Sequence, residues 1–351
     1  SIYLNYAKTL WRGGQYKEAK QQNQNAFKLA KELKQKSSQA LALYQLGVTE
    51  RDLNHIEKAK ELFEKSLTMY RDLKDKRFQT YPLYGLAVLY LNEGKLTEAE
   101  KAFSEVLNVY QEIGYKSGIS AAELNLGVIA HRRGNFEKAL EIYTAALNTA
   151  EEIGENLAIA YTLFSMGAVY YDRAKLTRAK QFFRSALSLM QKISAKGYYS
   201  YVLSYMSCVY AKEKKWKKAV ETALLHFKIA EETSSENEMA RTYLALALVL
   251  KENSKIPQKE TIEKATGLSV NGLHPAEKFF QKAMELAEKS KATFLLLHCY
   301  FEYAAYLQEK GRLEQASLLY KKAHILAQQS EMEEYLNNVQ ILLKPDKVMR
   351  G

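Results

Sequence analysis

The sequence predicts an all-α protein, an α-solenoid superhelix of about eight helical hairpins followed by a C-terminal capping helix. Three observations predict this fold. An alanine recurs every 40 residues, small and aromatic residues recur at fixed distances from it, and only 4 prolines and 16 glycines interrupt the 351 residues. So few turn-forming residues argue against a β-rich fold, which needs many tight turns.

The repeated alanine defines the length of one structural unit. It occurs six times at intervals of 40 residues and, after one interval of 57, twice more at the same spacing of 40. The eight positions are Ala19, Ala59, Ala99, Ala139, Ala179, Ala219, Ala276 and Ala316. A fixed period of this length is typical of repeat proteins. The long interval places a 17-residue insertion in the seventh unit.

Other positions repeat when each unit is numbered so that this alanine is position 20. Position 8 is small in every unit: Ala7, Gly47, Ala87, Gly127, Gly167, Ser207, Ala247 and Ala304. Position 24 is aromatic in most units: Phe63, Phe103, Tyr143, Phe183, Phe280 and Tyr320. Position 27 is alanine at Ala26, Ala146, Ala186, Ala283 and Ala323. Small residues at 8 and 20 let two helices approach closely, and the aromatic ring at 24 fills the space beside them.

Glycine or asparagine marks the turn between the two helices of a unit. Position 15 is Gly14, Gly94, Gly134 or Gly311, with Asn54 in another unit. Both residue types tolerate the left-handed backbone conformation that ends a helix. Each unit is therefore predicted to be a helical hairpin. One hairpin cannot bury both of its faces, so neighbouring hairpins must stack.

This pattern resembles the tetratricopeptide repeat, which has a small residue at position 8, alanine at 20 and 27, and an aromatic residue at 24. The 40-residue form resembles the repeats of kinesin light chains and of bacterial Rap-type peptide-pheromone receptors. The resemblance covers residues 1–328 and implies a right-handed superhelix whose first helices line the concave side. Asn23 and Ala223 depart from it at position 24, and His226 departs from it at position 27, so packing in the first and sixth units is harder to predict.

We expect two parts, a repeat array over residues 1–328 and a capping helix with a tail over residues 329–351. The insertion, about residues 253–275, carries turn signals and a segment, Gln258–Ala265, that can form a short helix. We expect a tolerated, partly mobile loop, although loops added to solenoids can also bind ligands. The capping helix is predicted at Glu331–Leu343 and the tail at Lys344–Gly351.

Composition restricts the function classes. Lys and Arg number 51 and Asp and Glu 40, a net charge of +11 that favours an acidic partner. Cys208 and Cys299 lie far apart in apolar helical stretches and form neither a disulfide framework nor a zinc spacing. Reduced cysteines, with no signal peptide and no apolar run of about 18 residues, favour a cytoplasmic protein. The chain begins at a repeat boundary without an initiator Met, so we expect a fragment whose upstream region was removed, the alternative being a trimmed full-length protein.

Catalytic signatures are not found in the sequence. It has no glycine-rich phosphate loop, no dinucleotide fingerprint and no HExxH, and its six histidines are scattered over separate repeats. Acidic residues fall on outer helix faces, where solvated surface accounts for them. We therefore expect no enzyme, no cofactor and no metal site.

Aromatic residues gather at first-helix positions that would face the concave groove. They are Tyr44, Tyr81, Tyr84, Tyr161, Phe164, Tyr171, Tyr201, Tyr205 and Phe301. Tyrosine offers a large apolar area with a polar tip, which suits a peptide groove. The alternative is that many of these rings simply pack on neighbouring helices.

Asn125 is the sharper candidate, with Asn5 equivalent in the first unit. The resemblance implies that an asparagine at this position bonds the backbone of an extended ligand, since a side-chain amide can donate and accept at once. The alternative is a solvated asparagine. The resemblance implies that a carboxylate clamp needs lysine and asparagine in the unit before Asn125, and lysine and arginine beyond it. This chain has Tyr84 and Val88 before it and Tyr161 and Ser165 beyond it, so chaperone C-terminal tails are disfavoured.

Positive charge gathers in the turns of the fourth, fifth and sixth units, which would stack along one rim. This basic edge comprises Arg132, Arg133, Arg173, Lys175, Arg178, Lys212, Lys214, Lys215, Lys217 and Lys218. Such a rim attracts acidic proteins or nucleic acid, although it can also serve only for solubility. Nucleic acid is the less favoured partner, because Trp216 is the only aromatic residue among those lysines.

The sequence thus favours a protein- or peptide-binding module, the receptor or scaffold part of a larger regulatory protein. Its ligand would be an extended peptide or a partner helix held in the aromatic groove. The alternative is a passive assembly scaffold that docks an acidic partner or nucleic acid on the basic edge.

Overall fold

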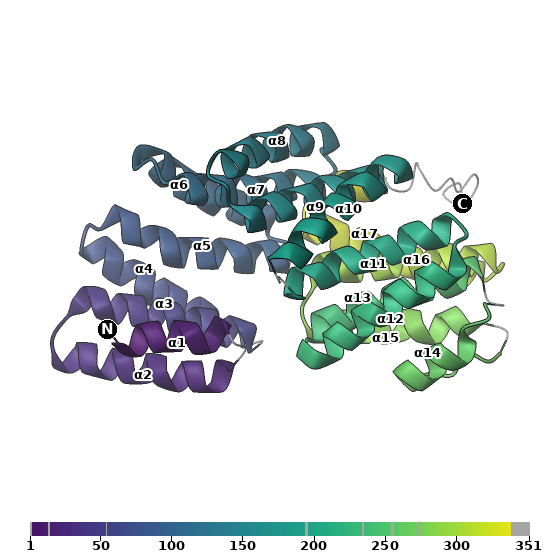
Figure 1. Ribbon diagram of the computed structural model, residues 1–351, viewed down its shortest axis with the longest axis horizontal. Coiled ribbons are helices and arrows are strands. Elements are labelled where there is room, and N and C mark those ends of the chain that lie inside the picture. The colour runs from purple at the N-terminus through teal and green to yellow at the C-terminus, as the bar shows by residue number, and fades with distance from the viewer. Residues whose placement is uncertain are drawn as a thin grey trace. The chain divides into compact units, whose positions relative to one another are not determined.

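The computed structural model describes residues 2–12, 15–53, 55–193, 196–233, 235–253, 256–272 and 274–337. Within these ranges the chain is helical and contains no strand, which confirms the all-α prediction (Figure 1). The helices are α1 Ile2–Arg12, α2 Tyr16–Glu32, α3 Lys36–Asp52, α4 Ile56–Asp72, α5 Lys76–Glu93, α6 Leu96–Glu112, α7 Lys116–Arg132, α8 Phe136–Glu152, α9 Asn156–Asp172, α10 Leu176–Lys192, α11 Lys196–Lys212, α12 Trp216–Thr233, α13 Glu236–Glu252, α14 Lys259–Thr266, α15 Pro275–Lys289, α16 Thr293–Glu309 and α17 Leu313–Gln329.

Each predicted hairpin is a pair of helices that follow each other in the chain, except that α13 pairs with α15 in the seventh unit. The first helices are α1, α3, α5, α7, α9, α11, α13 and α16, and α14 is an extra short helix in the insertion. Most helices have 17 residues, as in α3 and α4. Two such helices with their short turns make up the 40-residue period.

The small and aromatic positions interlock as predicted. The repeated alanines are fully buried or nearly so, and Phe63, Phe103, Tyr143 and Phe183 are fully buried. A Cβ added at Gly47 would lie 2.6 Å from Phe63 Cε1, and one at Gly127 would lie 2.5 Å from Tyr143 Cε1. Position 8 is therefore small because the ring at position 24 of the same hairpin occupies that space.

Gly167→Ala tests this interlock. The new Cβ would lie 2.6 Å from Phe183 Cε1, so we expect the free energy of unfolding to fall by about 1–3 kcal/mol. Urea unfolding followed by circular dichroism measures the change. Ser185→Ala, at an exposed position of α10, is the control and should be close to neutral. A Gly167→Ala protein as stable as wild type would contradict the interlock.

The chain divides into two compact units, unit 1 of residues 1–122 and unit 2 of residues 123–351. The division falls within α7, so no loop marks it. We describe each unit separately.

Unit 1 contains several contacts between aromatic rings of neighbouring helices. Tyr44 stacks on Tyr81 with ring centroids 5.6 Å apart and lies 5.9 Å from the Phe63 ring. The Tyr84 ring meets Phe103 edge-on at 5.2 Å. In the first repeat, Asn23 takes the aromatic position and is buried, where its amide donates to Thr49 Oγ1 at 3.4 Å. The buried amide of Asn23 is thus partly satisfied: its nitrogen has a hydrogen-bond partner.

Unit 1 also buries one carboxylate. The Glu50 side chain is 1% exposed and lies 2.7 Å from His55, 3.0 Å from Lys20 and 3.1 Å from Lys58. Burial alone would raise the pKa of Glu50, but the hydrogen bonds from His55, Lys20 and Lys58 outweigh it and lower the pKa to about 2.

Acid should therefore weaken unit 1 through Glu50. Its folded pKa lies below its unfolded value, so its contribution is present above about pH 4.5 and is lost as the pH falls towards 2. We expect Glu50→Gln to lower the free energy of unfolding by about 1–3 kcal/mol at neutral pH and by much less in acid. Urea titrations at several pH values measure this. The matched control is Glu61→Gln in exposed α4 surface; an equal loss in both variants would contradict the prediction.

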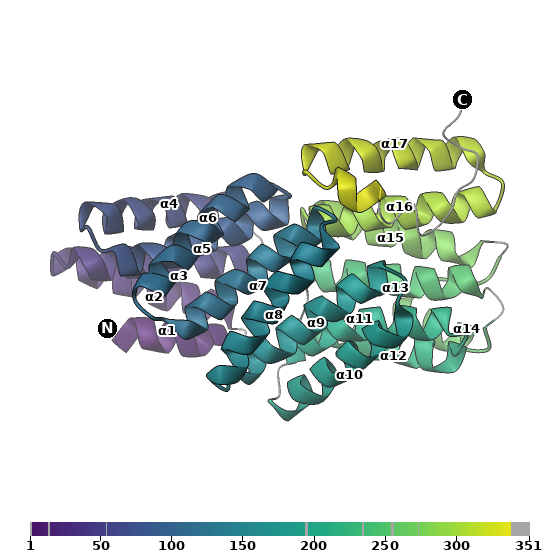
Figure 2. The same ribbon diagram turned by 90° about the horizontal axis from the view of Figure 1, so that it is seen from above.

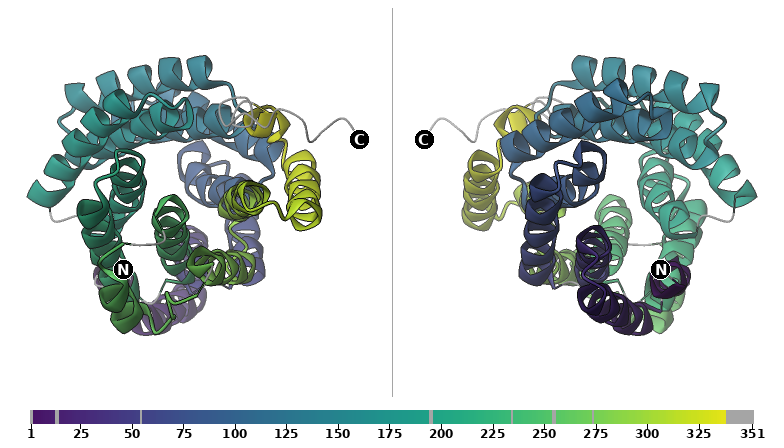
Figure 3. Two further views of the ribbon diagram at one scale, coloured as in Figure 1. Left: turned by 90° about the vertical axis from the view of Figure 1, so that its right-hand side faces the viewer. Right: turned by 90° about the vertical axis from the view of Figure 1, so that its left-hand side faces the viewer.

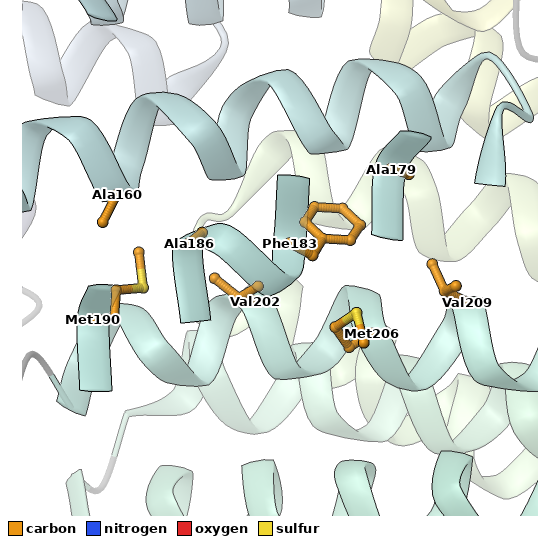
Figure 4. Close-up of a cluster of buried hydrophobic side chains, with 8 residues drawn as sticks. All are labelled: Ala160, Ala179, Phe183, Ala186, Met190, Val202, Met206 and Val209. Atoms are coloured by element: carbon orange, nitrogen blue, oxygen red, sulfur yellow. The ribbon is translucent and has the colours of Figure 1, made fainter. Parts of the chain in front are cut away.

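The core of unit 2 includes a cluster between α9, α10 and α11 (Figure 4). Figure 4 shows Phe183 of α10 directed between the alanines of its own hairpin and the apolar face of α11. Met190, Val202 and Met206 complete the contact and are at most 2% exposed.

The sixth repeat replaces the usual interlock with polar groups. His226 is fully buried, with its Nε2 3.1 Å from Glu238 Oε2 and its Nδ1 3.0 Å from Thr242 Oγ1. Ser200 Oγ also donates to Glu238 Oε2, at 2.7 Å. Burial raises the pKa of Glu238, but hydrogen bonds from His226 and the charge of Arg241 prevail and lower it. These bonds join α11, α12 and α13.

The insertion is packed rather than open. It forms α14 close to the predicted segment, and Ile256, Ile262 and Val270 are at most 2% exposed. Glu263 Oε1 accepts hydrogen bonds from the Asn271 side chain and from the Val270 amide. These hydrogen bonds and the contact of α14 with α12 hold the insertion against unit 2, which the expectation of a partly mobile loop did not include.

The chain after α17 turns back into unit 2. Residues 333–337 are helical, which agrees with the predicted capping helix over its described part; residues 338–343 and the predicted tail lie outside the described residues. Figure 2 shows this short helix beside α17. In Figure 3 the yellow end of the described chain reaches the first helices of unit 2, where a Cβ on Gly134 would lie 2.4 Å from Tyr335 N. The fourth and last repeats therefore touch through this segment.

Residues with a left-handed backbone conformation end the first helices, as predicted, but they are not all glycine. Gly94, Gly134 and Gly311 have φ of 78°, 84° and 75°. Ala174 and Lys214 occupy the same position of their repeats and also have positive φ, 55° and 59°. Gly14 and Asn54 lie outside the described residues.

Candidate functional site: a pocket in unit 2

A partly open pocket lies among the first helices of unit 2. Its lining residues come from α9, α11, α13 and α16, and from Tyr335 and Leu336 after α17. The space between its walls, including the mouth, is about 1030 Å³. Four successive repeats thus contribute to one concave surface, because each first helix presents the same face inward.

Aromatic and aliphatic side chains form most of the walls. Tyr171 and Tyr205 meet edge-on with ring centroids 5.5 Å apart. Phe294, Phe301 and Leu248 add further apolar surface. Burial raises the pKa of Tyr205 above its ordinary value, so its hydroxyl stays neutral and able to donate a hydrogen bond.

One side of the pocket carries a buried polar cluster. Asp172 Oδ2 lies 2.8 Å from His131 Nε2 and accepts a hydrogen bond from the Tyr335 hydroxyl at 3.2 Å. The Tyr335 hydroxyl also contacts His298 Nε2. Burial lowers the pKa of His298, although the Asp172 charge acts the other way. The cluster joins α7, α9 and α16 to the C-terminal segment.

Three cations lie over aromatic rings in and around the pocket. The Arg241 guanidinium is 4.3 Å from the Tyr201 ring centroid, and the Lys212 ammonium is 4.6 Å from that of Tyr171. Arg132 lies 4.9 Å from the Phe294 centroid. Burial, followed by the charge of Arg241, lowers the pKa of Arg132 to about 10. Two guanidinium groups thus raise the positive potential on this side of unit 2.

The profile of the tetratricopeptide repeat matches residues 1–72, 80–152 and 118–192, which together make up more than half of the chain. The chain belongs to the tetratricopeptide-repeat family. No curated protein sequence matches it significantly.

Solved structures share the fold of this tetratricopeptide-repeat chain. A Rap protein complexed with Competence and Sporulation Factor is 15% identical, with a TM-score of 0.66, over 95% of this chain and 98% of that one. The Rap conjugation gene regulator of the plasmid pLS20, in complex with the Phr* peptide, is 14% identical, with a TM-score of 0.66, over 89% and 79%. Aspartyl phosphate phosphatase F from Bacillus subtilis is 15% identical, with a TM-score of 0.62, over 87% and 75%. At such identities the likeness establishes the fold alone.

The pocket of this tetratricopeptide-repeat chain contains only part of the predicted groove set. Tyr171, Tyr205 and Phe301 line it. The Phe164 ring packs instead on Phe183, and Tyr201 lies under Arg241. The remaining aromatic candidates outside the lining are Tyr44, Tyr81 and Tyr84 of unit 1 and Tyr161 of unit 2. Asn125 is half-buried and also lies outside the lining of this pocket.

The sequence analysis missed several pocket residues. Arg241 and His298 stand at position 2 of their repeats, where the prediction rested on aromatic residues only. A search for charged residues at the groove-facing positions would have found both. Tyr335 lies beyond the last repeat, where the period gives no signal.

The predicted basic edge is divided in the structure. Arg132 is half-buried over Phe294, and Lys212 is turned over Tyr171. Ion pairs join Arg133 to Glu331 at 3.1 Å, Arg173 to Glu137 at 2.6 Å and Lys215 to Glu213 at 2.8 Å. The other members of the edge are exposed: Lys175, Arg178, Lys214, Lys217 and Lys218. Several of its cations thus contact a carboxylate or a ring, and its positive charge is less continuous than the sequence suggested.

Cys208 and Cys299 are unpaired and buried, as expected. Burial raises the pKa of the Cys208 thiol to about 12, so this pocket residue is a poor nucleophile. In the described part of the chain no cluster of three or more His, Cys, Asp or Glu side chains could hold a metal ion. No described helix is long and apolar enough to cross a membrane.

Proposed function

We propose that this chain is the peptide- or protein-binding part of a regulatory protein, and that it captures an extended peptide segment in the pocket of unit 2. The observation that supports it best is the pocket itself, in which four successive first helices form one apolar wall, with aromatic rings from α9, α11 and α16 beside hydrogen-bonding groups. The pLS20 regulator, whose fold is similar, was solved with a peptide.

The proposal assigns binding, not catalysis, to the chain, without a cofactor or a metal ion, and places it in the cytoplasm. It treats residues 1–328 as the repeat array and residues 329–351 as its closing segment. Because Tyr335 and Leu336 reach the pocket, the closing segment forms part of the binding surface.

A blocking substitution tests the pocket. Leu248 is half-buried in the wall, so Leu248→Trp should fill space that a ligand needs. The protein is incubated with pools of short synthetic peptides and passed through a spin column, and retained peptides are identified by mass spectrometry. We expect the wild type to retain peptides and Leu248→Trp to lose them. Leu225→Trp, on the exposed face of α12, is the control and should retain them. Equal retention by the blocked protein would contradict the proposal.

The same assay tests the wider groove. If the captured segment extends along α7 and α9, Asn125→Ala and Tyr161→Ala should reduce retention as well. Unchanged retention in both variants would restrict the binding surface to the pocket and remove these two residues from it.

The basic edge supports a second candidate, docking of an acidic partner. Lys214, Lys217 and Lys218 are exposed on one turn and the adjoining start of α12. Binding there should weaken steeply with salt, whereas capture by aromatic rings should not. Replacing these three lysines by glutamate should abolish binding of an acidic probe such as polyglutamate and leave peptide retention unchanged. Binding that survives this reversal would exclude the edge.

A further inference from the structure

The two carboxylates of the pocket are already occupied by protein partners. Asp172 accepts hydrogen bonds from His131 and Tyr335. Glu302 Oε2 accepts one from Lys251 Nζ at 3.3 Å. A basic ligand would therefore have to compete with bonds that the fold already makes.

Arg241 differs from these carboxylates, because one of its hydrogen-bond donors is left without an acceptor in the described part of the chain. Arg241 Nε is buried without a hydrogen-bond partner among the described residues, and its nearest carboxylate oxygen, Glu238 Oε1, is 3.9 Å away. The other oxygen of Glu238 is held by Ser200 and His226. Burial lowers the pKa of Arg241, but Tyr201, whose ring centroid is 4.3 Å away, and the Glu238 charge outweigh it and raise the pKa, so the guanidinium stays charged in the pocket.

Lys212 differs from Arg241 in burial and place. It ends α11 and is exposed, whereas Arg241 lies in the second turn of α13 with a side chain that is 16% exposed. An exposed ammonium keeps its water, so Arg241 gains more from an anionic ligand. Arg132, which lies over the pocket residue Phe294, is close enough to Arg241 for the two charges to repel each other, so it adds to the positive potential there.

We infer that the ligand captured in this pocket presents a carboxylate to Arg241, with its apolar part against Tyr205 and Phe294. A guanidinium group donates two parallel hydrogen bonds to a carboxylate, which both orients the ligand and satisfies the buried donor. The inference rests on the proposed function and adds the charge of the ligand. The carboxylate belongs either to a peptide C-terminus or to an aspartate or glutamate side chain.

Four peptide pools separate these sources. All have the same apolar and aromatic composition; the first has a free C-terminus, the second a C-terminal amide, the third an amide with one internal glutamate, and the fourth an amide with one internal lysine. Retention by the wild-type protein is measured for each. We expect the first or the third pool to be retained at least roughly tenfold better than the second. Preference for the first assigns the terminal carboxylate, and preference for the third assigns the side chain.

The other outcomes overturn the inference. If the fully amidated, acid-free pool or the lysine pool is retained as well as the acidic ones, the pocket binds peptides but does not recognise a carboxylate, and the proposed function survives alone. If no pool is retained, both the inference and the proposed function fail.

Variants at Arg241 test whether this residue recognises the carboxylate. Arg241→Met should abolish the preference for the acidic pool, and Arg241→Lys, which keeps the charge but not the fork, should reduce it. Arg184→Met, on the exposed face of α10, is the matched control and should keep the preference. Circular dichroism checks that each variant is folded. A full preference in folded Arg241→Met would overturn the role of this residue.

Discussion

Gly134→Ala is expected to detach the C-terminal segment from the start of unit 2 and to lower the free energy of unfolding by about 2–4 kcal/mol. Two costs combine at this residue. Its φ of 84° is unfavourable for any residue with a side chain, and the added Cβ would lie 2.4 Å from Tyr335 N. The three nearest atoms, Tyr335 N, Glu334 C and Tyr335 Cα, all belong to the backbone, so no flexible side chain can move away.

Gly311→Ala separates these two costs. Gly311 occupies the same repeat position with a φ of 75°, but a Cβ there would have no atom within 4 Å. We expect this control to lose only about 1–2 kcal/mol, the cost of the left-handed backbone. Urea unfolding measures both variants, and hydrogen exchange of residues 331–337 reports whether the segment stays docked. Equal losses in the two proteins, with unchanged exchange, would show that the C-terminal contact contributes nothing.

His226→Ala is expected to lower the free energy of unfolding by about 3 kcal/mol, although alanine is the usual residue at this position of the repeat. The substitution removes a buried partner from Glu238 and from Thr242 and leaves a cavity between α12 and α13. The sixth repeat needs the histidine because an alanine could hydrogen-bond neither Glu238 nor Thr242.

A double-mutant cycle isolates this pair. Glu238→Gln is made alone and together with His226→Ala, and urea unfolding gives the coupling free energy. We expect the double variant to lose clearly less stability than the sum of the single ones, because the loss of one partner already leaves the other unsatisfied. Additive losses would mean that His226 acts only by filling space.

The same pair predicts a response to acid. The folded pKa of Glu238 is lowered, so its stabilising contribution is present above its unfolded value and is lost as the pH falls below it. The pH dependence of unfolding should therefore be shallower in Glu238→Gln than in wild type at the acidic end. Identical profiles would contradict an ionised Glu238.

The candidate site was predicted less completely than the fold. Aromatic residues at groove-facing positions pointed to Tyr171 and Tyr205, which do line the pocket. The same rule also selected Tyr44 and Phe164, whose rings pack on Phe63 and Phe183. Position within a helix fixes which face a side chain occupies, but not whether that face meets a neighbouring ring or open space.

The sequence by itself determined the helical hairpins, their 40-residue period and the interlock of small and aromatic residues. These features depend on contacts between near neighbours in the chain, which recur in every repeat and are therefore visible as a pattern. The tertiary structure alone decided that Tyr335 reaches Asp172, that Arg132 turns inward over Phe294, and that Ala174 and Lys214 adopt the left-handed backbone of a glycine. Those outcomes depend on residues far apart in sequence or on packing that overrides local preference, and no periodic signal records them.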